Sequence, residues 1–203
     1  IGVYEIDKLA PPIHYKGFSP NEKKFIPLEY DTEMTLGEIL EKHSKGKEYG
    51  HLIKEANRYP VWVDSKGTIA SLSPVINSQT TGRITTKTKN VFLEVSGYNQ
   101  ETVNTALLVM AIAFLERGGK VEKAKVRYGK KTIETPLFEA KKITLDLEYA
   151  AKTIGTELSV KQAEKILASC GFEVKIKGKK AEVYYPNYRQ DILHQIDIIE
   201  DML

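Results

Sequence analysis

Four acidic side chains near the end of the chain have types and a spacing that suit metal binding: Asp191, Asp197, Glu200 and Asp201. The last three are spaced i, i+3 and i+4, so a helix through this stretch would present them on one face. Like charges on one face repel, and a bound cation would remove that repulsion. Hard oxygen ligands suit Mg²⁺. Two interpretations stay open: a magnesium site, or an exposed acidic face balanced by Arg189 and nearby lysines.

A second candidate is the carboxylate of Glu94, which lies in an apolar stretch shortly before Ser96. The segment 90–97, NVFLEVSG, alternates in the manner of a β-strand, so Glu94 and Ser96 would point to the same side. A carboxylate that faces the protein interior needs hydrogen-bond partners, because burying an unpaired charge is costly. The pair therefore indicates either a polar site in the interior or a strand face open to solvent.

The polar tract NSQTTGRITTKTKN, residues 77–90, mixes serine and threonine with basic residues. It is either a site wall that offers hydroxyls and cations to a polar ligand, or a hydrogen-bonding loop. The chain has no glycine-rich phosphate loop and no nucleophile beside an evident base. The histidines are scattered without the spacing of a zinc site, and the single cysteine, Cys170, lies well away from them in sequence. Covalent catalysis is not indicated.

The composition is that of a globular chain, with 203 residues, 41% hydrophobic and 28% charged, enough for one sizeable core or two modest ones. The longest apolar run, ALLVMAIAF at 106–114, is about half the roughly 20 residues that a bilayer span requires. A lone cysteine cannot form an internal disulfide, so a cytoplasmic location is expected. The start lacks an initiator Met and a signal peptide, and no helix-ending signal follows the terminal acids, so we expect a piece of a longer protein.

Basic residues outnumber acidic ones only slightly, 30 against 27, and the formal charge of +3 does not demand a polyanionic partner. They cluster in two stretches, KVEKAKVRYGKK at 120–131 and KIKGKK at 175–180. Each stretch is either a solvated strand and turn face that resists edge pairing, or a contact for phosphate groups.

The first half of the chain predicts short strands and one short helix. Residues 1–15 contain two strand-like runs separated by a proline pair, which can neither continue a helix nor donate to a ladder. A capping-box sequence starting at Thr35 predicts the beginning of the helix. Two β-rich runs within 59–77 flank the turn DSKG, which predicts a hairpin carrying Trp62 and Ser71 on neighbouring strands.

The strand at 90–97 is followed by an amphipathic stretch at about 100–117 that ends at two glycines. The strand-like run VEKAKVRY comes next. The order strand, helix, strand is typical of a βαβ unit, so a mixed α/β sheet is expected over the first two thirds of the chain.

The pattern resets near residue 135, which predicts a boundary between domains 1–134 and 135–203. The second part contains a strand at 142–149, two short helices, a hairpin around a lysine-rich turn and the acidic helix. Two helices followed by a wing-like hairpin are typical of nucleic-acid-binding domains, but they also fill small α+β domains. The predicted class is α/β (α+β), with a mixed sheet and packed helices followed by a small winged-helix-like domain.

Two stretches carry a family resemblance: PVINSQTTGRITTKTKNVFLEVSG, and PNYRQDILHQIDIIEDM near the end. They resemble the editing module and the following domain of the phenylalanyl-tRNA synthetase beta subunit of archaeal or eukaryotic type. The similarity extends over nearly the whole chain, including EMTLGEILEKHSKGKEYGHLI. It implies an ATP-dependent ligase of two alpha and two beta subunits, with aminoacylation on the alpha subunit. It also implies a proofreading site in 1–134 that removes tyrosine from phenylalanine tRNA.

The resemblance implies roles for particular residues. The tyrosine pocket would be formed by Trp62, Ser71, Glu94 and Ser96, with Asn77 in the asparagine-serine step that the family shares. Trp62 stands where the family often has a smaller apolar residue, and Ser96 stands where threonine is usual. The ligands of a Mg²⁺ ion shared with the alpha subunit would be Asp191, Asp197, Glu200 and Asp201.

A carboxylate suits the selection that such a site must make. Tyrosine differs from phenylalanine by one hydroxyl, which a synthetic pocket for phenylalanine cannot readily exclude by size. Glu94, with the Ser71 or Ser96 hydroxyl, can accept the phenol proton, whereas phenylalanine would leave the acceptor unpaired at a cost of about 1–3 kcal/mol. No general base is evident, so we expect a positioned water to hydrolyse the ester. The competing class is a nonenzymatic module that binds nucleic acid or assembles subunits.

Overall fold

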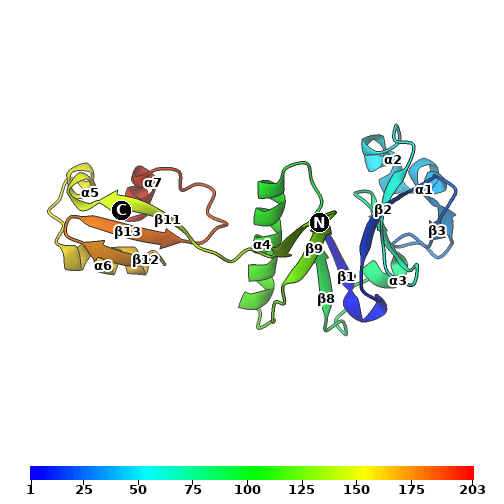
Figure 1. Cartoon of the computed structure of the whole chain (residues 1–203), viewed down its shortest axis with the longest axis horizontal. Coiled ribbons are helices and arrows are strands. Elements are labelled where there is room, and N and C mark those ends of the chain that lie inside the picture. The colour runs from blue at the N-terminus through cyan, green and yellow to red at the C-terminus, as the bar shows by residue number, and fades with distance from the viewer. The chain divides into compact units, whose positions relative to one another are not determined.

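The computed structural model describes residues 1–203 and consists of α-helices and antiparallel sheets, as Figure 1 shows. The predicted α+β class is confirmed. The chain divides into two compact units, Ile1–Val103 and Asn104–Leu203, and each is described by itself. No helix has the length and the apolar character needed to cross a membrane.

The first unit is built mainly of short antiparallel strands. Its central sheet has four strands in the order β2-β5-β6-β7, while β1 pairs with β8 and β3 with β4. The elements are β1 (Gly2–Glu5), β2 (His14–Phe18), β3 (Lys24–Phe25), β4 (Met34–Thr35), α1 (Leu36–Lys42), α2 (Ser44–Tyr49), β5 (Tyr59–Val63), β6 (Ile69–Leu72), β7 (Ile76–Asn77), α3 (Gln79–Gly82) and β8 (Val91–Glu94). The helix α4 (Gln100–Glu116) begins in this unit and continues into the second.

The helix α1 starts where the capping box predicts. The Thr35 hydroxyl accepts a hydrogen bond from the Glu38 N–H, and the Glu38 carboxylate accepts one from the Thr35 N–H. The helix packs into a first core cluster with the central sheet, and the cluster includes Leu36, Ile39, Val61, Val63, Ile69 and Leu72. Burying each such side chain fully contributes about 1.5–3 kcal/mol to folding, so packing rather than helix length holds this short helix in place.

The hairpin predicted within 59–77 is confirmed, because β5 and β6 pair antiparallel with Trp62 opposite Ser71. Its turn is held by Asp64. The Asp64 carboxylate accepts the backbone N–H groups of Ala10 at 2.8 Å, Lys66 at 2.9 Å and Thr68 at 2.7 Å. One buried side chain therefore connects the hairpin turn to the segment that follows β1.

A second core cluster lies around Tyr4 of β1 and Ala70 of β6, with Trp62 and Phe92 packed against it. The strand β6 is buried along its whole length and contributes side chains to both clusters. This double burial places the polar side chain of Ser71 inside the protein, where it requires hydrogen-bond partners.

The predicted βαβ unit, and with it the mixed sheet, is wrong. Every strand pairing is antiparallel: β8 pairs with β1, and β9 (Ala124–Tyr128) pairs with β10 (Lys131–Thr135). The pair β9–β10 closes through a short turn in which Gly129 has a φ of 58°. A tight turn needs only neighbouring residues, whereas a parallel pairing needs a long crossover, so the local hairpin forms.

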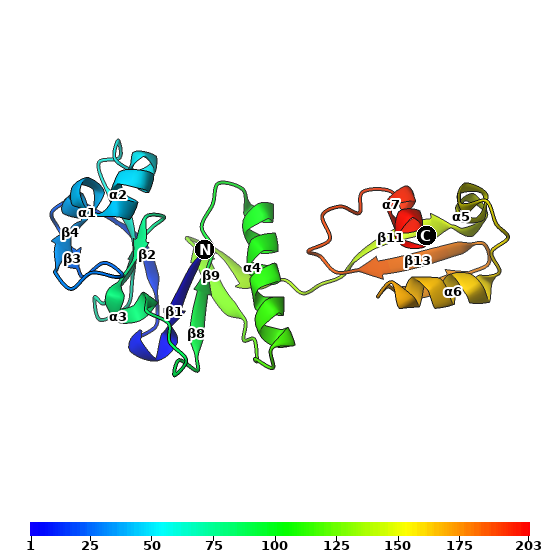
Figure 2. The ribbon, with the colours of Figure 1, turned by 180° about the vertical axis from the view of Figure 1, so that it is seen from behind.

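The second unit contains the β9–β10 hairpin and a three-stranded antiparallel sheet in the order β11-β13-β12. Figure 2 shows the hairpin β12–β13 with α6 beside it, seen from behind. The remaining elements are β11 (Lys141–Asp146), α5 (Leu147–Ile154), α6 (Val160–Ser169), β12 (Glu173–Lys177), β13 (Lys180–Tyr185) and α7 (Gln195–Asp201). A capping box formed by Ser159 and Gln162 starts α6.

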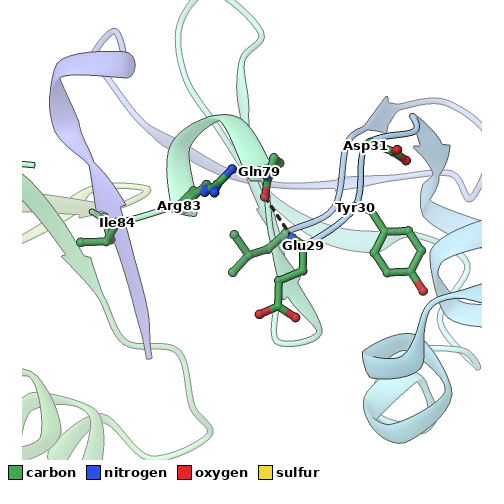
Figure 3. Close-up of a pocket in the computed structure, with 8 residues that line it drawn as sticks. Glu29, Tyr30, Asp31, Gln79, Arg83 and Ile84 are labelled. Atoms are coloured by element: carbon green, nitrogen blue, oxygen red, sulfur yellow. Dashed lines mark hydrogen bonds between the residues drawn. The ribbon is translucent and has the colours of Figure 1, made fainter. Parts of the chain in front are cut away.

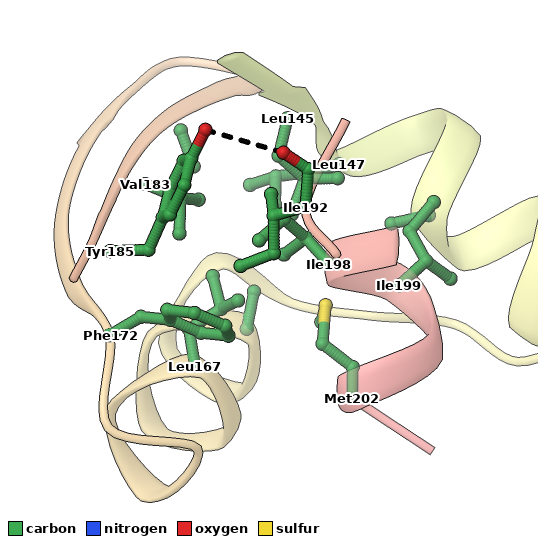
Figure 4. Close-up of a cluster of buried hydrophobic side chains, with 13 residues drawn as sticks. Leu145, Leu147, Leu167, Phe172, Val183, Tyr185, Ile192, Ile198, Ile199 and Met202 are labelled. Atoms are coloured by element: carbon green, nitrogen blue, oxygen red, sulfur yellow. Dashed lines mark hydrogen bonds between the residues drawn. The ribbon is translucent and has the colours of Figure 1, made fainter. Parts of the chain in front are cut away.

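The core of this sheet is one apolar cluster, drawn in Figure 4. Alternate residues of β13, Ala181, Val183 and Tyr185, are buried, so one face of the strand points into the core. The helices α5, α6 and α7 contribute Leu147, Leu167 and Ile198 to the same cluster, among others. The buried face of the strand and the apolar faces of the helices therefore pack against one another, as the sequence predicts for a small α+β domain. The boundary near residue 135 stays a prediction.

Candidate functional site

A small pocket in the first unit collects most of the residues expected to form a site. Its volume is about 50 Å³. The lining side chains come from β1, β6, β7 and the end of β8, which are far apart in sequence. They include Tyr4, Ser71, Ser73, Asn77, Glu94 and Ser96. Four strands and the segments that follow β6 and β8 thus place hydroxyls, an amide and a carboxylate around one space.

The polar groups of the pocket form a connected network around Glu94. The Ser96 hydroxyl donates to Glu94 Oε1, and the Tyr4 hydroxyl lies 3.4 Å from Glu94 Oε2. The Tyr4 hydroxyl also donates to Ser71 Oγ at 2.8 Å, and Ser73 Oγ lies 3.4 Å from Ser96 Oγ. Glu94 is only 7% exposed, so these hydroxyls replace the water that a carboxylate otherwise requires.

Strand pairing explains why Glu94 faces inward. In the β1–β8 ladder Glu94 lies opposite Gly2, and Phe92 lies opposite Tyr4. A Cβ on Gly2 would lie 2.2 Å from the Tyr4 hydroxyl oxygen, so only glycine leaves room for that hydroxyl. The strand ends at Glu94, and Ser96 reaches the carboxylate from the segment that follows.

Burial raises the pKa of the Tyr4 hydroxyl well above its usual range. The hydrogen bond with Ser71 opposes this rise, and the nearby Glu94 charge adds to it. The hydroxyl therefore keeps its proton near neutral pH and acts as a hydrogen-bond donor. Burial also raises the pKa of Tyr15, on which the Glu94 charge acts as well.

Trp62 is the predicted pocket residue that does not line the pocket. It lies opposite Ser71 in the β5–β6 ladder, but its ring packs against Tyr15 at 4.9 Å and Phe92 at 6.4 Å between centroids. The indole Nε1 is buried without a hydrogen-bond partner. Trp62 therefore supports the wall behind the pocket, and its size does not narrow the space in front of Glu94.

Sequence reasoning missed Tyr4 and Ser73, which complete the network. The signal for Tyr4 is the strand pattern of residues 2–5, in which alternate positions are buried. A tyrosine that faces inward on a strand usually finds a partner for its hydroxyl. The partners, however, are separated from it by 67 and 90 residues, so they could not be named from local patterns.

Asn77 is held in the pocket wall by a close approach of α3. A Cβ built on Gly82 would lie 2.5 Å from the Asn77 Cβ. We expect Gly82→Ala to push Asn77 out of place and to cost roughly 1–3 kcal/mol of stability, because the extra methyl has no free volume. Thermal unfolding and an Asn77 amide shift by NMR would measure both effects. Gly17→Ala is the control, since its Cβ would meet only the side chain of Arg58, at 3.1 Å; equal losses in both variants would contradict the prediction.

A wider groove of about 830 Å³ is lined by residues of α3 and by the segment 28–31, and Figure 3 shows the residues around it. Gln79 and Arg83 line the groove together with Glu29, Tyr30 and Asp31, and the Glu29 N–H donates to Gln79 Oε1 at 3.0 Å. Glu29 adopts a φ of 69°, a left-handed backbone that is uncommon for a non-glycine residue. The groove offers both charges and an aromatic ring beside the smaller pocket, which it adjoins through Asn77 and Gly82.

The acids near the end of the chain make different kinds of contact. Arg189 donates to both Asp191 oxygens at 2.9 and 3.0 Å and to Asp201 Oδ2 at 2.7 Å. The Arg189 guanidinium therefore lowers the pKa of Asp191. Asp197 instead accepts the N–H groups of His194 at 2.6 Å and Leu193 at 2.8 Å, which cap α7 and lower the pKa of Asp197. The helix begins at Gln195, so Asp191 lies in the segment before it.

In this arrangement the four acids do not fit a magnesium ion. No group of three or more His, Cys, Asp or Glu side chains gathers in a way that could hold a metal. A guanidinium already occupies the space between Asp191 and Asp201, as the balanced acidic face with Arg189 predicts. Arg189 therefore neutralises Asp191 and Asp201, while backbone N–H groups bind Asp197.

Magnesium and EDTA are both expected to leave the melting temperature of this chain unchanged, because Arg189 neutralises the acids that a cation would need. Arg189→Gln should lower the unfolding free energy by about 1 kcal/mol and make the chain sensitive to millimolar Mg²⁺. Thermal unfolding with and without Mg²⁺ measures this. Arg58→Gln, at an exposed pair with Glu22, is the control. Stabilisation of the unaltered chain by Mg²⁺ would contradict the prediction.

Two family models match the chain. Residues 1–129 match the B3/4 domain, and residues 143–203 match the tRNA synthetase B5 domain. The phenylalanine–tRNA ligase beta subunit of Thermococcus kodakarensis is 48% identical to the chain over 203 residues. The chain belongs to the phenylalanyl-tRNA synthetase beta-subunit family. The resemblance noted in the sequence is thereby confirmed.

Other phenylalanyl-tRNA synthetase beta subunits give the same result. The subunit of Pyrococcus horikoshii is 48% identical over 203 residues, which are 100% of this chain and 36% of that protein. A crystal structure of an N-terminal fragment of the Pyrococcus horikoshii beta subunit has a TM-score of 0.95 and 47% identity, and the match covers 99% of this chain and 58% of that one. The Thermococcus kodakarensis match covers 100% of this chain and 35% of the relative, so the chain spans about a third of the curated relatives' length.

Proposed function

We propose that residues 1–134 of this phenylalanyl-tRNA synthetase beta-subunit chain hydrolyse the ester bond of tyrosine that has been attached in error to phenylalanine tRNA. The observation that carries the proposal is the buried carboxylate of Glu94 among hydroxyl groups at the bottom of a small pocket. Phenol is the group that distinguishes tyrosine from phenylalanine, and a buried acceptor recognises it. Selection and removal of the wrong amino acid would then take place at one site.

The energetics favour selection by hydrogen bonding over selection by size. A site for phenylalanine rejects an added hydroxyl only weakly, because the two rings are nearly the same size. A buried carboxylate reverses the preference, since phenylalanine would leave an acceptor without a partner at a cost of about 1–3 kcal/mol. Glu94 has Ser71 and Ser96 beside it, so a phenol hydroxyl could both donate to the carboxylate and accept from a serine.

The pocket must widen when a tyrosyl group binds. A cavity of about 150 Å³ accommodates benzene, whereas this pocket measures about 50 Å³ and has room for one or two water molecules. We infer that ligand binding widens the pocket while the hydrogen-bonding groups on the strands keep their places.

The hydrolysis would proceed by attack of a positioned water on the ester carbonyl. The C–O bond to the tRNA ribose breaks, the amino acid leaves as the free acid, and the ribose hydroxyl regains its proton. The proposal gives Glu94, and the Ser96 hydroxyl that donates to it, the task of recognising the phenol, so acceleration would come from placement of the water and from hydrogen bonding to the developing oxyanion. The groove beside α3 is the proposed path for the acceptor end of the tRNA, because Gly82, which lines the groove, lies against Asn77, which lines the pocket.

The second part of the chain, residues 135–203, is proposed to assemble with the alpha subunit. Two apolar side chains next to the acidic stretch are exposed, Leu193 at 72% and Ile196 at 41%, which suits burial by a partner. A magnesium ion shared with that subunit remains part of the proposal only if assembly moves Arg189 away from Asp191 and Asp201. Aminoacylation would require the whole enzyme.

Deacylation of tyrosine-charged and phenylalanine-charged phenylalanine tRNA by this chain tests the editing function. Faster release of tyrosine would support it, and no release or equal release would contradict it. The alternative, a module that only binds nucleic acid, predicts binding to tRNA and duplex DNA with a steep salt dependence and no hydrolysis.

A further inference from the structure

The hydroxyl of Tyr4 meets the two groups that the proposed function assigns to the ligand's phenol. It donates to Ser71 Oγ at 2.8 Å and lies 3.4 Å from Glu94 Oε2. Tyr4 is 1% exposed, and its ring stacks on Phe92 at 6.1 Å between centroids. Packing therefore fixes the hydroxyl in the floor of the pocket.

The Tyr4 side chain has little freedom to leave this position. Its ring belongs to the second core cluster with Ala70, and the backbone of Gly2 covers its hydroxyl so closely that no Cβ fits. Displacing the ring would open a cavity in the core, which is strongly destabilising. A ligand therefore meets Tyr4 as part of the wall.

The direction of the hydrogen bonds decides which groups in the pocket donate to a ligand and which accept from it. Tyr4 has one hydroxyl proton, and it gives that proton to Ser71 at the shorter of its two contacts. The Ser71 oxygen is then engaged as an acceptor, so its own proton is free to point to another acceptor. Ser96 donates to the other oxygen of Glu94 and keeps that carboxylate in one orientation.

We propose that Tyr4 is a positioning residue that determines specificity: it holds Ser71 as a donor toward the hydroxyl of a phenolic ligand, next to the acceptor Glu94. This inference rests on the proposed editing function. A phenol hydroxyl donates and accepts at once, so it satisfies both groups, whereas a phenyl ring satisfies neither. Tyr4 thus acts through Ser71 and not on the ester itself.

The test compares binding of tyrosinol and phenylalaninol, which carry the two side chains without an ester, by titration calorimetry. The unaltered chain is expected to bind tyrosinol about tenfold more tightly. Tyr4→Phe removes the hydroxyl and keeps the ring, and it is expected to reduce this preference to about twofold by weakening tyrosinol alone. Tyr59→Phe is the matched control, because Tyr59 is a buried tyrosine of the first core cluster and lies outside the pocket.

A second variant tests whether Tyr4 acts through Ser71. Ser71→Ala alone should lose the preference, and adding Tyr4→Phe should change it by less than about twofold further, since coupled groups are not additive. If Tyr4→Phe does not fold, 3-fluorotyrosine at position 4 replaces it. That substitution makes the hydroxyl a stronger donor and is expected to widen the preference.

The outcomes separate this inference from the proposed function. Equal binding of both alcohols by the unaltered chain would overturn the proposed function together with the role of Tyr4. A clear preference that survives Tyr4→Phe, or is unchanged by 3-fluorotyrosine, would overturn the role of Tyr4 alone. Equal weakening of both alcohols by Tyr4→Phe would also overturn it, because that result describes a purely structural residue.

Discussion

Replacing Glu94 by alanine is expected to reduce the preference for tyrosine over phenylalanine in deacylation by roughly tenfold to a hundredfold. The carboxylate is the only charged group in the pocket lining, and the Ser96 hydroxyl already donates to it. Without it, the phenol proton has no charged acceptor, and tyrosine loses its advantage. Rates of release from tyrosine-charged and phenylalanine-charged phenylalanine tRNA measure the effect.

Two further variants make this result specific. Glu94→Gln keeps the size and one acceptor oxygen of the side chain, so it should retain part of the preference. Glu55→Ala removes a carboxylate from an exposed side chain outside the pocket and should change nothing. Thermal unfolding of each variant shows whether the fold persists. Unchanged selective release by Glu94→Ala would remove Glu94 from the site and with it the main support for the editing function.

Local signals in the sequence predicted the helix starts well. Thr35 and Ser159 each form the capping box that their spacing indicates, and Gly155 follows α5 in the left-handed conformation that favours glycine. Each of these structures depends on hydrogen bonds between residues a few positions apart. The sequence therefore contains all the groups that decide the outcome, and a pattern of three or four residues is enough.

Strand partners could not be predicted in the same way. The order strand, helix, strand suggested a parallel pairing, but β8 pairs with β1 from the start of the chain. Nothing in the alternation of residues 90–97 identifies that partner, because any strand with an apolar face satisfies it equally. The choice depends on long-range packing, here of Tyr4 against Phe92.

The candidate site follows the same division. The family resemblance named Ser71, Asn77, Glu94 and Ser96, and all four line one pocket. The alternation of residues 90–97 predicts only that Glu94 and Ser96 lie on the same side of the strand. It does not identify Tyr4 as a further residue of the pocket. In the acidic stretch, the i, i+3, i+4 spacing predicts that Asp197 shares a helix face with Glu200 and Asp201. The spacing does not show that the Asp197 carboxylate instead accepts a backbone N–H at the start of α7.

Replacing Asp64 by alanine is expected to lower the unfolding free energy of the chain by roughly 2–4 kcal/mol. Asp64 is 4% exposed and accepts three backbone N–H groups, from Ala10, Lys66 and Thr68. Alanine would leave these donors unpaired inside the protein. The loss would loosen the turn of the β5–β6 hairpin, which carries Ser71. Chemical unfolding at neutral pH measures the effect.

The same contacts predict a pH dependence of stability. Burial alone would raise the pKa of Asp64, but hydrogen bonds from Ala10, Thr68 and Lys66 outweigh it and lower the pKa. A carboxyl with a lower pKa in the folded than in the unfolded state stabilises the fold fully above the unfolded value of about 3.9. That contribution disappears as the pH falls through the lower folded value. Asp64→Asn cannot titrate, so its unfolding free energy should fall less steeply below about pH 4 than that of the unaltered chain; parallel curves would show that Asp64 does not contribute.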